Sequence, residues 1–301
     1  MGAQETSSYV AQIVSGDQAA VPAAVPVTPK TVDVNGTRVT YHVQGERNLD
    51  HDPVVLIHGT SGTTQGHFGF LFPMLAVRHK VISPDFALPV DLAGNLTLEH
   101  MEEQVLAVLA DAAPGQKVTL VGYSLGAAIA AFIAARHPER ISNLVLLAGW
   151  IKTDTQQFLF NHVWRTLRDL DDPAINEFTI FGAFGAPFLA TKTLAEMARG
   201  AMPLDRLVDL QMDLNLRVDL TDLVPAIKAR TLVIACTYDQ MVPRHHSKAL
   251  FGAIEDARYS EVAAGHAVVF ERPAEVFRLI DNFAARPDAY PAGSIIPAVK
   301  P

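Results

Sequence analysis

Short apolar runs alternate with longer stretches of helical periodicity along most of the chain. Apolar positions recur at helical spacing in "LTLEHMEEQVLAVLADAA", "LGAAIAAFIAARHPER" and "PAEVFRLIDNFAA", which predicts three helices. Five other runs are too apolar for exposed strands and are typical of buried parallel ones. They lie at residues 53–59, 79–86, 117–123, 143–150 and 230–239. This alternation predicts an α/β fold with a mostly parallel central sheet flanked by helices.

Three segments depart from this alternation. Asn35-Gly36 separates two alternating runs near the start, which predicts an antiparallel hairpin at the edge of the sheet. Residues 151–223 are helical in character and contain no convincing buried strand, so we expect an inserted helical cap. The core is then formed by residues 31–150 and 224–285. Residues 1–30 and 286–301 are rich in proline and small residues, so we expect an extended lead-in and tail without packed structure.

Composition narrows the classes of function. The chain has 301 residues, 49% of them hydrophobic, which is enough for one domain with a full core. Its formal charge is −8 and its basic residues are scattered, which argues against binding to nucleic acid or to an anionic membrane. Cys236 is the only cysteine, and neither a signal peptide nor a membrane-spanning run is evident. We therefore expect a cytoplasmic protein without disulfides.

The segment Gly122-Tyr123-Ser124-Leu125-Gly126 lies between a predicted buried strand and a predicted helix. In this context the pattern G-x-S-x-G is typical of a tight turn that presents the serine hydroxyl above the sheet. A serine in this place could instead only cap the helix. We favour the first interpretation and predict that Ser124 is a nucleophile.

A serine nucleophile needs a base, and the base needs an orienting group. Asp239 follows the last predicted buried strand, and His266 precedes the last predicted helix. The order Ser124, Asp239, His266 is the one that this kind of sheet requires. Asp154, which follows the neighbouring strand, is the alternative carboxylate.

Acyl transfer also requires hydrogen-bond donors for the oxyanion, each worth about 3 kcal/mol in the transition state. The loop "HGTSG" at residues 58–62 follows the first parallel strand and can direct the backbone N–H of Thr60 to the same point as that of Leu125. We predict these two donors. His58 is expected to hold the loop by hydrogen bonds.

Aromatic residues are frequent in the predicted cap. Most of them should form the cap's own core, and a minority should line an apolar pocket at the C-terminal edge of the sheet, where ligands of such sheets bind. The candidate pocket residues are Tyr123, Trp150, Phe158, Trp164, Phe181 and Phe184.

The sequence gives no reason to expect a metal or a cofactor. It has no H-E-x-x-H motif and no phosphate-binding loop. His245 and His246 are adjacent, so on a helix their side chains should diverge, and we interpret them as part of an exposed face.

The segments "HGTSG", "GYSLGAAIA", "HPERISNLVLLAG", "TLVIACTYDQMVP" and "GHAVVFERPAEV" resemble, in order, the recurring segments of the α/β-hydrolase superfamily over residues 31–285. The resemblance implies an α/β-hydrolase fold with Ser124 as nucleophile, His266 as base and Asp239 as its partner. It also implies that Thr60 and Leu125 are the oxyanion donors. In place of the family's common glycine-rich loop, residues 85–95 contain proline and leucine, so we expect a remodelled pocket wall there.

Three functions remain open. The first is a serine hydrolase that cleaves a small apolar ester, thioester or lactone through an acyl-enzyme on Ser124. The second uses the same residues for carbon–carbon bond hydrolysis, a lyase reaction or acyl transfer. The third is a ligand-binding protein on a hydrolase scaffold. The sequence also leaves open whether the protein forms homo-oligomers.

Overall fold

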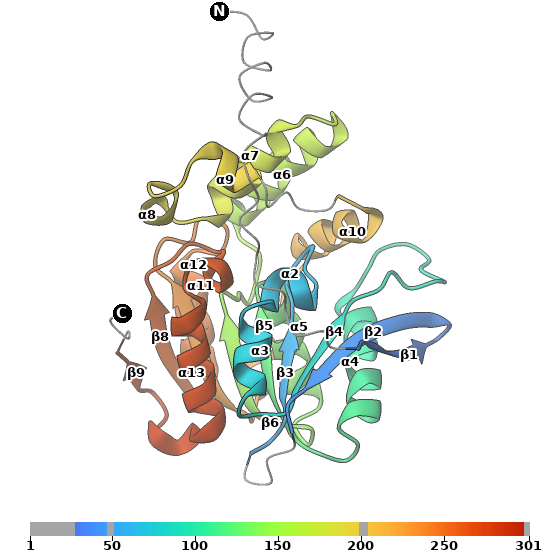
Figure 1. Cartoon of the computed structure of the whole chain (residues 1–301), viewed down its shortest axis with the longest axis vertical. Helices are drawn as coiled ribbons and strands as arrows, with labels where there is room; N and C mark the ends of the chain where they lie inside the picture. Colours follow the sequence, from blue (N-terminus) through green and yellow to red (C-terminus); the bar gives the residue numbers. More distant parts are fainter. Residues whose placement is uncertain (1–27, 47–50, 199–203, 298–301) are drawn as a thin grey trace, which may run out of the picture.

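A nine-stranded sheet runs through the centre of the molecule (Figure 1). The computed structural model describes residues 28–46, 51–198 and 204–297. The strand order is β1-β2-β4-β3-β5-β6-β7-β8-β9. The pairs β1–β2 and β2–β4 are antiparallel and the other pairs are parallel. The strands are β1 (Lys30–Val34), β2 (Thr37–Gln44), β3 (Val54–Ile57), β4 (Val81–Asp85), β5 (Val118–Tyr123), β6 (Ile141–Leu147), β7 (Arg230–Cys236), β8 (Ala257–Val262) and β9 (Ile295–Ile296).

Helices cover both faces of the sheet because the central strands are apolar on both sides. In β3, Val55 and Ile57 belong to one core cluster, and Val54 and Leu56 belong to the other. The first cluster also includes residues of α4 (Leu98–Ala112), α5 (Leu125–Arg136) and α11 (Arg244–Ala253). The second includes residues of α2 (Thr64–Phe68), α3 (Leu71–Ala76), α12 (Val268–Glu271) and α13 (Pro273–Ala285).

A helical insertion separates β6 from β7 and lies beyond the C-terminal ends of the parallel strands (Figure 1). We call this insertion the cap. Its helices have a small apolar cluster of their own, formed by Trp164, Ile175, Val208 and Met212. The helices are α6 (Thr155–Asp169), α7 (Ala174–Ala183), α8 (Ala186–Leu189), α9 (Leu194–Ala198) and α10 (Arg206–Asn215), followed by the 3-10 helix η1 (Val224–Ala226).

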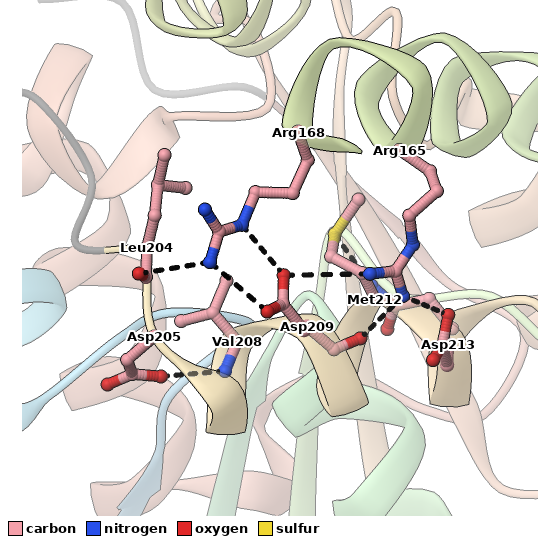
Figure 2. A network of polar contacts seen from close by, with 9 residues as sticks. Arg165, Arg168, Leu204, Asp205, Val208, Asp209, Met212 and Asp213 are labelled. Carbon is pink, nitrogen blue, oxygen red and sulfur yellow. Dashed lines mark hydrogen bonds and ion pairs between the residues drawn. The ribbon is translucent and has the colours of Figure 1, made fainter. Parts of the chain in front are cut away.

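Ion pairs between α6 and α10 supplement this small cluster (Figure 2). Arg168 donates from Nε and Nη2 to the two carboxylate oxygens of Asp209, at 3.0 and 3.2 Å. Arg165 pairs with Asp213 and donates to the backbone oxygen of Asp209. A bidentate guanidinium–carboxylate pair fixes orientation as well as distance, so α10 is held in one register against α6.

The predicted α/β-hydrolase fold is confirmed, with its mostly parallel sheet and helical insertion. The five predicted buried strands correspond to β3, β4, β5, β6 and β7, and the three predicted helices to α4, α5 and α13. Asn35 and Gly36 form the expected hairpin turn with φ of 51° and 80°. The precise limits predicted for core and cap stay predictions, and residues 1–27 lie outside the described part of the chain.

The C-terminal segment differs from the expected unpacked tail. Ile295 and Ile296 form β9 and pair in parallel with β8. The strand β8 itself was not predicted, because Arg258, Ser260 and Glu261 interrupt its apolar pattern. Arg258 is nevertheless buried, and its Nε donates to the backbone oxygen of Tyr290 at 2.7 Å. The strand therefore carries a buried guanidinium, which binds the tail, at a position where a buried strand usually has an apolar side chain. For this reason the apolar pattern of the sequence did not predict it.

Among the residues that the structure describes, no helix is long and apolar enough to cross a membrane.

Candidate active site

Ser124 lies in a sharp turn between β5 and α5. Its φ of 57° and ψ of −123° are unusual for a residue with a side chain, and such strain is typical of functional turns. The flanking glycines explain how the turn closes. A Cβ on Gly122 would lie 2.2 Å from the backbone oxygen of Gly126, and a Cβ on Gly126 would lie 2.1 Å from that of Ile57. Side chains at these two positions would therefore force the turn apart.

The structure brings together the three residues predicted as nucleophile, base and orienting group. Ser124 Oγ lies 2.8 Å from His266 Nε2, and His266 Nδ1 lies 2.7 Å from Asp239 Oδ2. His266 and Asp239 are both buried, so their interaction is poorly screened by solvent. An imidazole that donates from Nδ1 to the carboxylate has Nε2 free to accept the serine proton.

Backbone hydrogen bonds fix the second oxygen of Asp239. Its Oδ1 accepts from the N–H groups of Met241 and Val242, at 2.9 and 2.7 Å. Tyr123 fixes the other partner, because its hydroxyl donates to the backbone oxygen of His266 at 2.8 Å. Burial raises the pKa of Tyr123 well above its usual value, so this hydroxyl keeps its proton. Asp239 and His266 are thus each held in orientation by hydrogen bonds other than the one that joins them.

The alternative carboxylate Asp154 lies elsewhere. It caps α6 by accepting from the N–H of Gln157, and its Oδ2 lies 3.0 Å from His245 Nε2 and 3.1 Å from His246 Nε2. The expectation that these two histidines diverge is wrong: their ring centroids are 4.2 Å apart. The first turn of α11 directs both rings to one carboxylate, which helical periodicity alone does not reveal.

The loop after β3 reaches the serine closely. A Cβ on Gly59 would lie 2.8 Å from Ser124 Cβ, so only glycine permits this approach. Thr60 follows and lines the cavity that contains Ser124. Leu125 is the first residue of α5, and an N–H in that position has no acceptor within its own helix. The positions of Thr60 and Leu125 are compatible with their predicted role as oxyanion donors.

The cap holds this loop in place, a feature that the sequence did not reveal. Gln211 of α10 accepts from the N–H of Ser61 at 2.9 Å, and Asn215 donates from Nδ2 to the hydroxyl of Thr60 at 3.0 Å. Gln211 is buried. Because 150 residues separate Ser61 from Gln211, no local signal connects them.

His58 holds the same loop from below, as expected. Its Nδ1 is 2.9 Å from the backbone oxygen of Gly59, and its Nε2 accepts from the N–H of Phe86 at 3.2 Å. These two partners require a neutral ring with its proton on Nδ1. Burial lowers the pKa of His58, which favours the same neutral form.

His67 is a residue of the site that sequence reasoning missed. It belongs to the short helix α2, lines the cavity and accepts from the N–H of Gly59 at 3.3 Å. Burial, with further contributions from His58 and His266, lowers the pKa of His67 to about 3. A neutral acceptor therefore supports the loop that carries Thr60.

A cavity of about 600 Å³ lies between the sheet edge and the cap. Four of the six predicted pocket residues line it: Tyr123, Trp150, Trp164 and Phe184. Phe158 and Phe181 do not, and this part of the prediction is wrong. Both are more than half exposed, because they lie on the outer faces of α6 and α7. Residues 85–95, expected to form a pocket wall, also contribute nothing to the lining.

The cap also contacts the loop that carries His266. The N–H of Ala267 donates to the backbone oxygen of Ala183 at 2.8 Å. Glu271 accepts from the N–H groups of Gly185 and Gly265, at 2.8 and 3.1 Å. The cap therefore closes the cavity and also supports both loops beside Ser124.

This arrangement can perform nucleophilic substitution at an acyl carbon. It combines a serine hydroxyl, a base within hydrogen-bond distance, a carboxylate behind the base and a mostly apolar, partly open cavity above them. Among the described residues that line the cavity, the potential metal ligands His67, Glu196 and His266 do not form a close group of three.

Comparison with known proteins identifies the family. Residues 52–273 match the family model of the alpha/beta hydrolase fold. A pyrrolizixenacetamide deacetylase of Xenorhabdus hominickii is 28% identical over 272 residues, which are 85% of this chain and 98% of that protein. A 2-hydroxymuconate semialdehyde hydrolase of Pseudomonas putida is 27% identical over 288 residues, which are 89% and 98% of the two chains.

A solved structure agrees in fold. The enol-lactonase from Burkholderia xenovorans LB400 superimposes with a TM-score of 0.69 and 23% identity, over 84% of this chain and 99% of that one. The chain belongs to the α/β-hydrolase family, and it is an enzyme of that family.

Proposed function

We propose that this α/β-hydrolase cleaves a small, mostly apolar acyl compound through a covalent acyl-enzyme on Ser124. The observation that carries the proposal is the continuous hydrogen-bonded chain from Ser124 Oγ through His266 to Asp239. It lies at the base of the cavity under the cap.

In the first half-reaction, His266 Nε2 takes the hydroxyl proton while Ser124 Oγ attacks the acyl carbon. Asp239 stabilises the imidazolium that forms, and the N–H groups of Thr60 and Leu125 stabilise the oxyanion. The imidazolium then gives its proton to the leaving group. In the second half-reaction, His266 activates a water that releases the acyl group from Ser124.

The cavity lining indicates the kind of substrate. The wall is rich in aromatic and thioether side chains, among them Trp150, Phe160, Phe184, Met212 and Phe270. Three asparagines also contribute to the wall, Asn161, Asn176 and Asn215. Since a few polar groups in an apolar pocket fix the orientation of a ligand, we expect a substrate with a polar group within an apolar body.

An ester, thioester or lactone fits this chemistry, and the deacetylase relative supports adding an N-acetyl amide to the candidates. Carbon–carbon bond hydrolysis is the second candidate. It is favoured by the similarity to 2-hydroxymuconate semialdehyde hydrolase, which extends over 98% of that protein. The same serine, base and oxyanion donors serve either bond, so the substrate decides between them.

The first test is intact-mass spectrometry after incubation with a fluorophosphonate. Wild-type protein should gain a single adduct and Ser124→Ala none. With p-nitrophenyl esters, Ser124→Ala should lower kcat by about 10⁴-fold or more, since loss of a serine nucleophile has effects of that order. Absence of the adduct on folded wild-type protein would refute the activated serine and favour a binding function.

A substrate panel then separates the candidates. Esters, acyl thioesters, N-acetyl amides and 2-hydroxymuconate semialdehyde should be compared by kcat/KM. We expect acyl substrates to be preferred over 2-hydroxymuconate semialdehyde. The reverse order, with a normal adduct on Ser124, would retain the nucleophile and replace the acyl substrate by a carbon–carbon bond.

A further inference from the structure

A second cluster of reactive side chains lies where the cap meets the core. Asp154 at the start of α6 and His245 and His246 at the start of α11 each offer one ligand atom, and these atoms all lie within 4.8 Å of one another. The carboxylate Oδ2 is 3.0 Å from His245 Nε2 and 3.1 Å from His246 Nε2. Ligands of a tetrahedral zinc ion with bonds of about 2.0 to 2.1 Å are about 3.3 Å apart, so the two carboxylate–imidazole distances need only small adjustment.

His246 gives an independent indication of a missing partner. Its side chain is 7% exposed, and its Nε2 is buried without a hydrogen bond although it lies close to Asp154 Oδ2. His245 makes a hydrogen bond to that oxygen. One carboxylate oxygen thus lies beside two imidazoles, and a cation placed between the three atoms would bind all of them.

Asp154 is also held in position for such a role. Its Oδ1 accepts from the N–H of Gln157 at 3.0 Å, which leaves Oδ2 directed at the histidines. Nearby, Gln156 Nε2 donates to the backbone oxygen of Gln240 at 2.8 Å. Outer contacts of this kind fix the orientation of metal ligands.

We propose that Asp154, His245 and His246 form a binding site for a divalent transition metal, with Zn²⁺ as the ion that fits this donor set best. His245 is 60% exposed, so the remaining coordination position faces solvent and a water completes the tetrahedron. The ion would join α6 of the cap to α11 of the core. It would also restrain residues 239–243, which carry Asp239 and precede α11.

The test uses full-length protein freed of metal with a chelator and titrated with zinc chloride in a calorimeter. Wild-type protein should bind one equivalent, and Zn²⁺ should raise its melting temperature. His245→Gln and Asp154→Asn should each weaken zinc binding at least about tenfold, because even outer contacts of metal sites are worth that much. Both substitutions should leave the fold intact, because His245 is exposed and asparagine also caps helices well.

Two control variants separate this site from other histidines. His162→Gln removes an exposed imidazole from the same helix α6, and His266→Gln removes the imidazole next to Ser124. Both should bind zinc as the wild type does. The proposal is overturned if wild-type protein shows no saturable one-to-one binding, if His245→Gln and Asp154→Asn keep wild-type affinity, or if His266→Gln abolishes binding.

Discussion

The cavity lies between the C-terminal ends of the central strands and the cap. These two regions are stabilised differently. The turn at Ser124 lies between a fully buried strand and a helix whose residues are almost all buried. The cap has a small apolar cluster and relies in addition on ion pairs such as Arg168–Asp209 and Arg165–Asp213. Packing against buried backbone leaves no alternative positions, whereas partly exposed ion pairs permit local opening. We therefore expect substitutions in the two regions to change different quantities.

The largest effect should come from the turn at Ser124. In Gly126→Ala the new Cβ would lie 2.1 Å from the backbone oxygen of Ile57, and no flexible side chain can move to relieve this contact. The variant should lose about 3 kcal/mol or more of unfolding free energy together with nearly all activity. Urea denaturation and ester hydrolysis measure both quantities.

Gly252→Ala is the matched control. A Cβ on Gly252 meets nothing within 4 Å, and the residue lies in α11, where alanine is the better helix former. It should keep full activity and gain up to about 1 kcal/mol. Equal behaviour of the two variants would show that close backbone contact does not set the geometry of the turn.

A smaller and different effect is expected in the cap. Arg168→Gln removes the bidentate contact to Asp209. The side chains of Arg168 and Asp209 are each about one quarter exposed. It should lower the free energy of unfolding only slightly, since ion pairs that solvent can reach contribute little to stability. Because α10 holds the loop of Thr60 and Ser61, the KM for a bulky ester should rise more than kcat falls.

Lys228→Gln is the control for removal of an ion pair outside the cap. Lys228 and Glu255 form an exposed pair at 3.8 Å, so this substitution should change neither stability nor KM measurably. If Arg168→Gln also leaves KM unchanged, the cap does not depend on its ion pairs to hold the loop beside Ser124.

The same contrast explains what the sequence could predict. The turn at Ser124, the loop at Thr60, the end of β7 and the loop before the last helix are defined by local patterns of apolar runs, glycines and polar residues beside predicted strands and helices. The relative positions of Ser124, Asp239 and His266 follow from the order of parallel strands. These three residues could therefore be proposed together without the structure.

The cap could be predicted only as a helical insertion. Whether an aromatic residue faces the cavity depends on how each helix is rotated, so Trp164 lines the cavity and Phe158 on the same helix does not. The contacts of Gln211 and Asn215 with the loop after β3 join residues about 150 positions apart. No short-range pattern records such pairings. His67 was missed because its helix spans only five residues.

The loss of stability at acidic pH should occur over different pH ranges for His67 in the core and for Asp219 in the cap. Burial lowers the pKa of His67 from 6.5 to about 3, so between these values the unfolded chain binds a proton that the folded chain does not. Folding is therefore favoured fully above pH 6.5 and less as the pH falls towards 3. His67→Asn keeps an acceptor for Gly59 and cannot titrate, so its stability should decline less over this range in urea denaturation. An equally steep decline would mean that His67 is protonated in the folded protein.

The smallest effect is expected at the base of the cap, where Lys152 Nζ lies 2.7 Å from Asp219 Oδ2. Hydrogen bonds from Lys152 and from Thr221 lower the pKa of Asp219 to about 2. The carboxylate therefore favours the folded state above its usual pKa of 3.8, and this contribution is lost as the pH falls towards 2. Both side chains are exposed, so high salt should weaken the contribution further.

Asp219→Asn should accordingly lower the melting temperature slightly at pH 5 and match the wild type near pH 2, a comparison that scanning calorimetry can make. The pH range of this effect differs from that of His67, which changes the stability mainly at higher pH. A double variant should therefore show two separate changes, one beside the cavity and one at the base of the cap. If Asp219→Asn instead changed stability as much near pH 2 as at pH 5, its effect would come from packing, and the base of the cap would resemble the sheet edge in how it is held.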